Sequence, residues 1–196
     1  MVRIGLTGGI ASGKSSVAKI LSKHGIPIIN ADEISHRLLE RGTPTHAAIL
    51  KKFGESVLGK DGEIDRKELG RLVFGNTEAL RSLEQILHPV VIREVMDQMR
   101  FLEDEGEEIV VAEVPLLFEV GMEEIFDRIW VVSATPDEQL QRLTERDKLS
   151  PSEAARRIEH QLPLSEKEEK AHAVIFNNQD LHTLEARVLQ LLKTVE

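Results

Sequence analysis

The sequence contains no cysteine, so the chain can form no disulfide and can hold no metal through thiolates. No run of residues approaches the roughly 20 consecutive apolar residues of a membrane-spanning helix, and we therefore expect no membrane association. Apolar residues make up 41% of the chain and charged residues 30%, which is typical of a soluble, globular protein.

The chain also lacks an excess of positive charge: it has 25 Lys and Arg but 34 Asp and Glu, and its formal net charge is −9. There is no basic tract, and nucleic acid is therefore not expected as a partner. A local pocket for phosphates needs only a few basic side chains and stays open. No signal peptide precedes the first apolar segment, so we expect a cytoplasmic location, where ATP is abundant.

A phosphate-binding pattern stands near the start of the chain. Gly8 to Ser15 reads Gly-Gly-Ile-Ala-Ser-Gly-Lys-Ser and fits G-x-x-x-x-G-K-[ST]. Glycines let successive backbone N–H groups point into one concavity, Lys14 adds a charge near the β- and γ-phosphates, and the Ser15 hydroxyl can ligate Mg²⁺. We expect the nucleotide phosphates to be bound by Gly9, Ile10, Ala11, Ser12, Gly13, Lys14, Ser15 and Ser16.

The context of this pattern favours a true phosphate loop over a glycine-rich turn that matches by chance. An apolar strand from Val2 to Leu6 precedes it, and a helix over 16–23 with one apolar face follows. The N-terminus of that helix would add its amides and its dipole to an anion site.

A second strand is predicted over 26–30, followed by a helix over 33–39. Asp32 lies between them, at the carboxyl end of the strand, where open α/β sheets bind ligands. Aspartate is also a favoured helix N-cap, and the spacing leaves both roles open.

Residues 44–102 show only helical periodicity, over 47–53, 66–74 and 77–102. His88-Pro89 interrupts the last of these, and we expect a new helix to begin with Pro89 in its first turn. The pattern predicts an all-helical insertion over 36–102 that holds a second substrate.

The remaining chain alternates strands and helices, which predicts an α/β fold: a doubly wound parallel sheet of about five strands. Further strands are expected over 109–112, 127–132 and 173–176. Arg142 and Arg146 lie on predicted helices within 139–164 that suit a lid closing on phosphate. The alternative for these arginines is ordinary surface charge on a helix.

Several segments together resemble the dephospho-coenzyme A kinase family, and the resemblance covers essentially the whole chain. The most discriminating are His88-Pro89 and the Val114–Glu119 segment. The other matching positions are Ile4 to Ser15, Asn30-Ala31-Asp32 followed by His36, Arg142-Leu143, Arg146, Gln161, Lys167 and the segment from Val174 to Asn177.

The chain departs from the family pattern at three places. Asn30 stands where the family usually has an acid, and Ala171-His172 stands where it usually has Ala-Asp. The turn after Asn177 is Asn178-Gln179-Asp180, where the family commonly has Ser-Gly-Ser.

The resemblance implies a P-loop NTPase-type fold that transfers the ATP γ-phosphoryl group to the ribose 3′-hydroxyl of dephospho-coenzyme A, the last step of coenzyme A synthesis. ATP and Mg²⁺ would be the cofactors, and the chain would be a monomer or weak oligomer. The implied catalytic residues are Lys14, Asp32, Arg142 and Arg146. Asn177 would join the nucleotide site, and the implied acceptor-binding residues are Asp32, His88, Pro115, Leu116 and Leu117.

Two other readings remain open. One is a P-loop kinase for another nucleoside or nucleotide, and the other is a regulatory nucleotide-binding switch. The Asn-Lys-x-Asp of guanine-binding switches and the Leu-Ser-Gly-Gly-Gln of transporter ATPases are both absent from the sequence. On the kinase reading, 1–196 is one P-loop kinase domain with its nucleotide-binding core in 1–35 and 103–196.

Overall fold

A computed structural model describes residues 1–195 of the chain, apart from the side chain of Phe74. The strands are β1 (Val2–Gly8), β2 (Ile28–Asn30), β3 (Ile109–Glu113), β4 (Arg128–Ser133) and β5 (Ala173–Phe176). The α-helices are α1 (Lys14–Lys23), α2 (Ala31–Leu38), α3 (Pro44–Phe53), α4 (Arg66–Phe74), α5 (Thr77–Asp104), α6 (Pro136–Asp147), α7 (Pro151–Glu159), α8 (Leu164–Lys170) and α9 (Leu181–Leu192).

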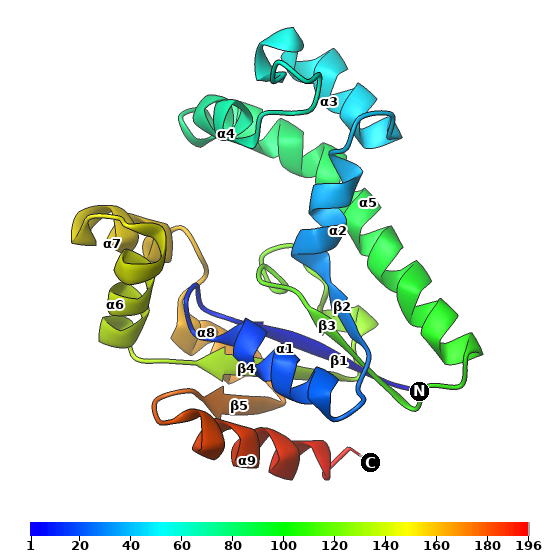
Figure 1. Ribbon diagram of the computed structural model, residues 1–196, viewed down its shortest axis with the longest axis vertical. Helices are drawn as coiled ribbons and strands as arrows, with labels where there is room; N and C mark the ends of the chain where they lie inside the picture. Colours follow the sequence, from blue (N-terminus) through cyan, green and yellow to red (C-terminus); the bar gives the residue numbers. More distant parts are fainter. Residues whose placement is uncertain (196) are drawn as a thin grey trace. The chain divides into compact units, whose positions relative to one another are not determined.

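The chain divides into two compact units (Figure 1). We call Met1–Asn30 together with Gln98–Glu196 the sheet unit, and Ala31–Asp97 the helical unit. Over the described residues, no helix combines the length and the apolar character needed to cross a membrane.

The sheet unit is built on five parallel strands in the order β2-β3-β1-β4-β5, which confirms the predicted fold class. Leu6 of β1 lies beside Glu113 of β3, and Gly8 lies beside Val132 of β4. The carboxyl ends of these three strands therefore meet at one edge, the edge at which open α/β sheets bind ligands.

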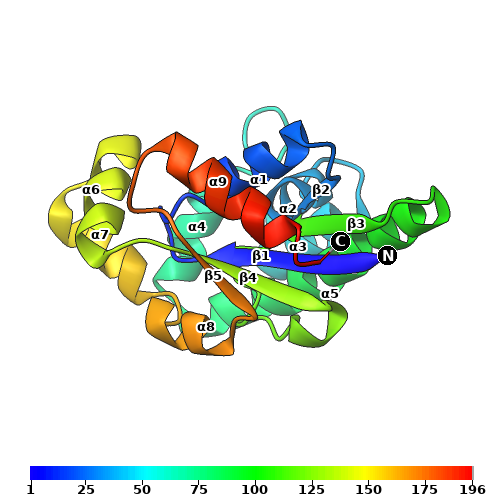
Figure 2. The ribbon, with the colours of Figure 1, turned by 90° about the horizontal axis from the view of Figure 1, so that it is seen from below.

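Helices cover both faces of this sheet (Figure 2). α1 and α9 lie on one face and α8 on the other, while α6 and α7 stand beyond the end of the strands. The core beneath α1 and α9 is apolar and almost fully buried, with Leu21, Trp130 and Val188 at its centre. This burial fixes where β1 ends and α1 begins.

The helical unit has a core of its own, formed by Leu39, Ile49, Val57, Ile64, Leu69 and Val73. Its helices carry strong local start signals. Thr43 caps α3 ahead of Pro44, and Asp65 caps α4 by accepting bonds from two backbone amides. Apart from the isolated antiparallel bridge Leu58–Ile64, the described part of this unit is helical or irregular.

The prediction that a new helix begins at Pro89 is wrong. α5 is one helix of 28 residues with Pro89 inside it. A proline within a helix costs about 3 kcal/mol because it removes one backbone bond and crowds the preceding turn. Apolar residues hold the helix on both sides of the interruption, with Ile86 packed on the helical unit's core and Val95 fully buried.

Helix α8 was not expected from the sequence. Its residues read Leu-Ser-Glu-Lys-Glu-Glu-Lys, and only the first is apolar. The residue that α8 buries is Lys167, whose side chain is fully inaccessible to solvent. A search for apolar periodicity cannot find a helix whose buried side chain is charged.

Side chains that cover the sheet leave no space beside Gly5 of β1. A Cβ atom at this position would lie 2.6 Å from Leu117 Cδ1 and 2.9 Å from Phe126 Cδ2. We expect Gly5→Ala to lower the free energy of unfolding by about 1–3 kcal/mol, as overpacked cores do. Gly75→Ala is the control, since the nearest atom to its Cβ is 3.8 Å away. Urea unfolding measures both, and equal stability of the two variants would contradict the packing.

Helix α6 begins with a capping box that links Thr135 and Glu138. The Thr135 N–H and hydroxyl donate to Glu138 Oε2 at 2.8 and 2.9 Å, and the Thr135 hydroxyl accepts from the Glu138 N–H. The hydrogen bond from the Thr135 backbone, more than any other contact, lowers the pKa of the Glu138 carboxyl below its ordinary value of 4.5.

This lowered pKa predicts a pH-dependent contribution to stability. Because the carboxylate is stabilised in the folded chain, its contribution is complete above pH 4.5 and is lost as the pH falls through the folded pKa. We expect Glu138→Gln to be less stable than the parent at pH 7, with the difference shrinking toward pH 3. Urea unfolding at several pH values, with Glu145→Gln on the same helix as control, checks this. A difference that stays constant with pH would rule it out.

Candidate functional site

The loop between β1 and α1 curls at the carboxyl edge of the sheet. Ala11 and Gly13 both have positive φ, at 58° and 101°. Gly13 adopts this conformation without strain, whereas Ala11 is a non-glycine residue held in the left-handed region. Strained backbone of this kind is typical of ligand-binding loops.

Two other segments lie so close to this loop that a side chain at Gly9 or Gly13 would displace the amide groups that contact it. A Cβ atom on Gly9 would lie 2.2 Å from Gln139 Nε2, and one on Gly13 would lie 2.1 Å from Asn177 Nδ2. The same amides bind the loop: Gln139 donates to the carbonyl of Ile10 at 2.7 Å, and Asn177 to that of Ser12 at 2.8 Å. The loop is thus held from α6 and from the turn after β5.

Lys14 lies at the mouth of the loop. Its Nζ donates to the carbonyls of Gly8 and Gly9 at 3.3 and 3.0 Å. Helix α1 starts at this residue, and within the described chain no side chain caps its N-terminus. The ammonium group and the helix N-terminus together form a positive concavity that suits a phosphate group.

A carboxylate meets the loop from the neighbouring strand. The Ser15 hydroxyl donates to Glu113 Oε1 at 3.1 Å, and Glu113 is the last residue of β3 and is buried. No role for Glu113 was predicted from the sequence, although an acid directly follows the apolar run over 109–112. The available signal was an acid ending an apolar strand, and it becomes decisive only once β3 is known to lie beside β1.

The two candidate arginines of α6 have different surroundings. Arg142 donates to the carbonyls of Asn177 at 2.8 Å and Ser12 at 3.5 Å, which places it on the loop. Arg146 instead forms a bidentate pair with Asp147, at 2.7 and 3.2 Å, and its side chain is 60% exposed. The Arg146 guanidinium lowers the pKa of the Asp147 carboxyl, to which Arg157 also donates.

The segment after β3 forms a wall of the sheet unit. The carbonyl of Pro115 accepts from the Thr7 hydroxyl at 3.2 Å, at the root of the loop. Leu117 is fully buried, whereas Leu116 is 40% exposed. Leu116 is therefore the apolar side chain of this segment that a ligand can reach.

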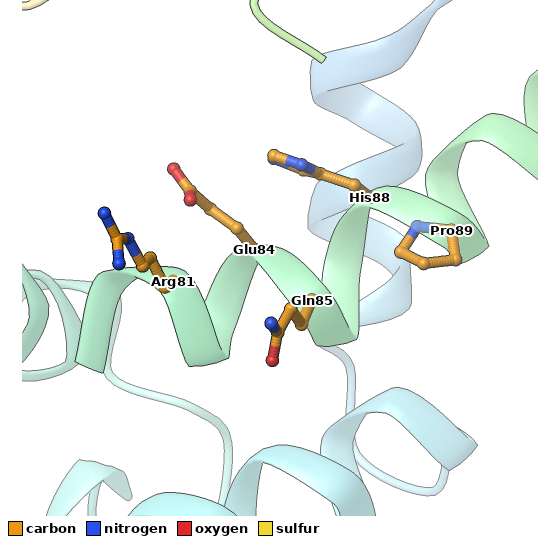
Figure 3. Close-up of a pocket in the computed structure, with 5 residues that line it drawn as sticks. All are labelled: Arg81, Glu84, Gln85, His88 and Pro89. Carbon is orange, nitrogen blue, oxygen red and sulfur yellow. The ribbon is translucent and has the colours of Figure 1, made fainter. Parts of the chain in front are cut away.

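Asp32 and His88 belong to the helical unit. Asp32 is the second residue of α2, within its first turn, so it does not occupy the N-cap position. His88 lines an open hollow of about 280 Å³ along α5 (Figure 3). Arg81, Glu84 and His88 point to one side of the helix, while Gln85 and Pro89 point away from them.

Comparison with known proteins identifies the family. A sequence model described as dephospho-CoA kinase matches residues 2–183. A dephospho-CoA kinase of Carboxydothermus hydrogenoformans is 43% identical over 190 residues, which is 97% of this chain and 92% of that protein. One from Bacillus licheniformis is 44% identical over 191 residues, covering 97% and 95%.

Solved structures agree with these relatives. A crystal structure from Thermus thermophilus is 35% identical with a TM-score of 0.86, covering 100% of this chain and 98% of that one. Dephospho-CoA kinase from Campylobacter jejuni is 31% identical with a TM-score of 0.75, covering 98% and 96%. A shikimate kinase from Acinetobacter baumannii, 20% identical over 99% and 94% with a TM-score of 0.57, shares the fold. On the family match and these relatives, the chain belongs to the dephospho-CoA kinase family.

Proposed function

We propose that this protein transfers the γ-phosphoryl group of ATP to the 3′-hydroxyl of the ribose in dephospho-coenzyme A. The phosphate loop, with Lys14 at its mouth and the Ser15–Glu113 pair beside it, carries the proposal of phosphoryl transfer from ATP, and the family match supports dephospho-coenzyme A as the acceptor. In phosphoryl transfer the protein mainly positions the reacting groups and stabilises the charge of the transition state. A rigid loop with one ammonium group and a helix N-terminus supplies both.

Ser15 and Glu113 are the residues suited to hold Mg²⁺. A hydroxyl and a carboxylate oxygen 3.1 Å apart are the hard oxygen donors that this ion prefers. When bound, the ion would neutralise charge on the β- and γ-phosphates. Glu113 would also keep the Ser15 hydroxyl oriented toward the strand end.

Arg142 supports the nucleotide side of the proposal. Its contacts with the carbonyls of Ser12 and Asn177 hold a fixed positive charge against the phosphate loop. We propose that Arg142 and Asn177 line the nucleotide site and that 139–164 acts as the lid. Arg146 would join the site by exchanging the Asp147 carboxylate for a phosphate oxygen, which is a charge-for-charge exchange at an exposed position.

We assign acceptor binding to Asp32 and His88 of the helical unit. Within the sheet unit, we assign it to Pro115 and Leu116, and the buried Leu117 would support their backbone. His88 and Arg81 share one side of α5 and provide donors for an anionic acceptor such as dephospho-coenzyme A (Figure 3). Asp32 would orient or deprotonate the acceptor hydroxyl. We also propose a cytoplasmic location, where ATP is abundant, and a monomer or weak oligomer.

The direct test is a coupled ADP assay with ATP, Mg²⁺ and a panel of acceptors. We expect turnover with dephospho-coenzyme A and little with nucleoside monophosphates or shikimate. Lys14→Ala should reduce kcat by about a hundredfold or more, as loss of one preorganised charged donor does. Lys19→Ala, which removes an exposed lysine from the same helix, should remain active. Preference for another acceptor would disprove the assignment, and an active Lys14→Ala would disprove the role of the loop.

Asp32→Asn should lower kcat much more than it changes KM for ATP, because the substitution removes the base but not the nucleotide contacts. Glu33→Gln is the matched control, since both acids lie in the first turn of α2. If Asp32 served only the helix dipole, the two variants would lose similar small amounts of stability and keep their turnover. Steady-state kinetics with unfolding curves separates these outcomes.

A further inference from the structure

A buried lysine lies on α8, in a part of the sheet unit that the proposed chemistry does not use. The Lys167 side chain is fully inaccessible, and its Nζ lies 2.7 Å from Glu119 Oε1 and 3.4 Å from the carbonyl of Pro115. A buried ammonium group is costly unless it is paired. The position of α8 is therefore tied to the carboxylate of Glu119.

The same carboxylate oxygen also holds the chain between α7 and α8. Glu119 Oε1 accepts a hydrogen bond from the Leu162 N–H at 3.1 Å. Lys167 thus fixes the carboxylate, and the carboxylate fixes the backbone at Leu162. Hydrogen bonds to a charged acceptor are stronger than those between neutral groups.

The residue before Leu162 contacts the phosphate loop. Gln161 Oε1 accepts from the Ile10 N–H at 2.8 Å, while Gln139 donates to the Ile10 carbonyl. The two glutamines come from opposite ends of 139–164 and hold the same residue of the loop. Gln139 is buried, so its amide is committed to this contact.

We propose that Gln161 is a positioning residue for the phosphate loop and that the Lys167–Glu119 pair is the anchor that holds it there. The loop then keeps its curved shape because Ile10 is bound on both its N–H and its carbonyl, and the phosphates would be bound by the N–H groups that follow Ile10 in the loop. The anchor makes the contact depend on α8, which lies outside the loop and outside 139–164. This inference rests on the proposed function, since it assumes that the loop binds nucleotide phosphates.

The carbonyl of Pro115 strengthens the same connection. It accepts from the Thr7 hydroxyl and from Lys167 Nζ. Thr7 is the second-to-last residue of β1 and directly precedes Gly8, the first residue of the phosphate-binding pattern. The anchor is therefore joined to both the start of the loop, through Thr7, and its middle, through Ile10.

The first test is Gln161→Met, which keeps the size of the side chain and removes the acceptor. We expect binding of a non-hydrolysable ATP analogue with Mg²⁺, measured by calorimetry, to weaken about threefold to tenfold, the usual worth of one hydrogen bond. The melting temperature should change little. Gln141→Met is the control, because Gln141 is exposed and the described hydrogen bond of its side chain goes to Glu145, away from the loop. Unchanged nucleotide binding by Gln161→Met would overturn the proposal.

The second test asks whether the anchor acts through Gln161. Lys167→Met should weaken analogue binding, and adding Gln161→Met should weaken it by less than about twofold more, because residues in one network are not additive. Lys167→Met alone leaves the Glu119 carboxylate without its buried partner. If that variant does not fold for this reason, the double variant Lys167→Met/Glu119→Gln, which leaves no buried charge unpaired, takes its place in the comparison with Gln161→Met. Fully additive losses would overturn the proposed role of the Lys167–Glu119 pair as anchor.

A parent that binds the analogue tightly but phosphorylates no dephospho-coenzyme A would contradict the proposed function and leave this coupling measurable.

Discussion

The carbonyl of Ser12 is the point at which two distant parts of the chain, α6 and the turn after β5, bind the phosphate loop. Asn177 and Arg142 both donate to it. The next residue is Gly13, where a Cβ atom would collide with the Asn177 amide. These contacts hold the backbone of the phosphate loop from outside, so its N–H groups are set before any ligand arrives. Preorganised donors need no rearrangement during the reaction, and such groups supply the largest part of charge stabilisation in many enzymes.

Much of the fold could be predicted because its signals are local. The strand before Gly8, the helix after Lys14 and the apolar run of β3 confirm what the patterns indicated. Two errors share a cause. α8 buries a lysine in place of an apolar face, and α5 continues through Pro89 because residues on both sides of the proline are held. In both cases tertiary contacts override the local preference, which a single sequence does not reveal.

The site was predictable only where its residues lie together in the chain. The spacing of Lys14 and Ser15 within one motif points to phosphate and Mg²⁺. The partnership of Ser15 with Glu113 depends on β3 lying beside β1, and strand order cannot be derived from one sequence. Arg142 and Arg146 share a helical face, and each pairs with an acid of its own helix, Glu138 and Asp147. What separates them is the contact of Arg142 with the carbonyl of Asn177, 35 residues away, which the sequence does not reveal.

If the helical unit binds the acceptor, as we propose, the division into two units lets one fold serve different acceptors. A shikimate kinase at 20% identity shares this architecture, so the parallel sheet does not determine what is phosphorylated. The helical unit has its own core around Ile49 and Val57, separate from the core beneath α1 and α9. Substitutions at the positions of that unit to which we assign acceptor binding would act on a different set of packed side chains from those that hold the phosphate loop. Energetic effects at sites that share no partners are close to additive, and acceptor specificity can therefore change without loss of the loop's preorganised geometry.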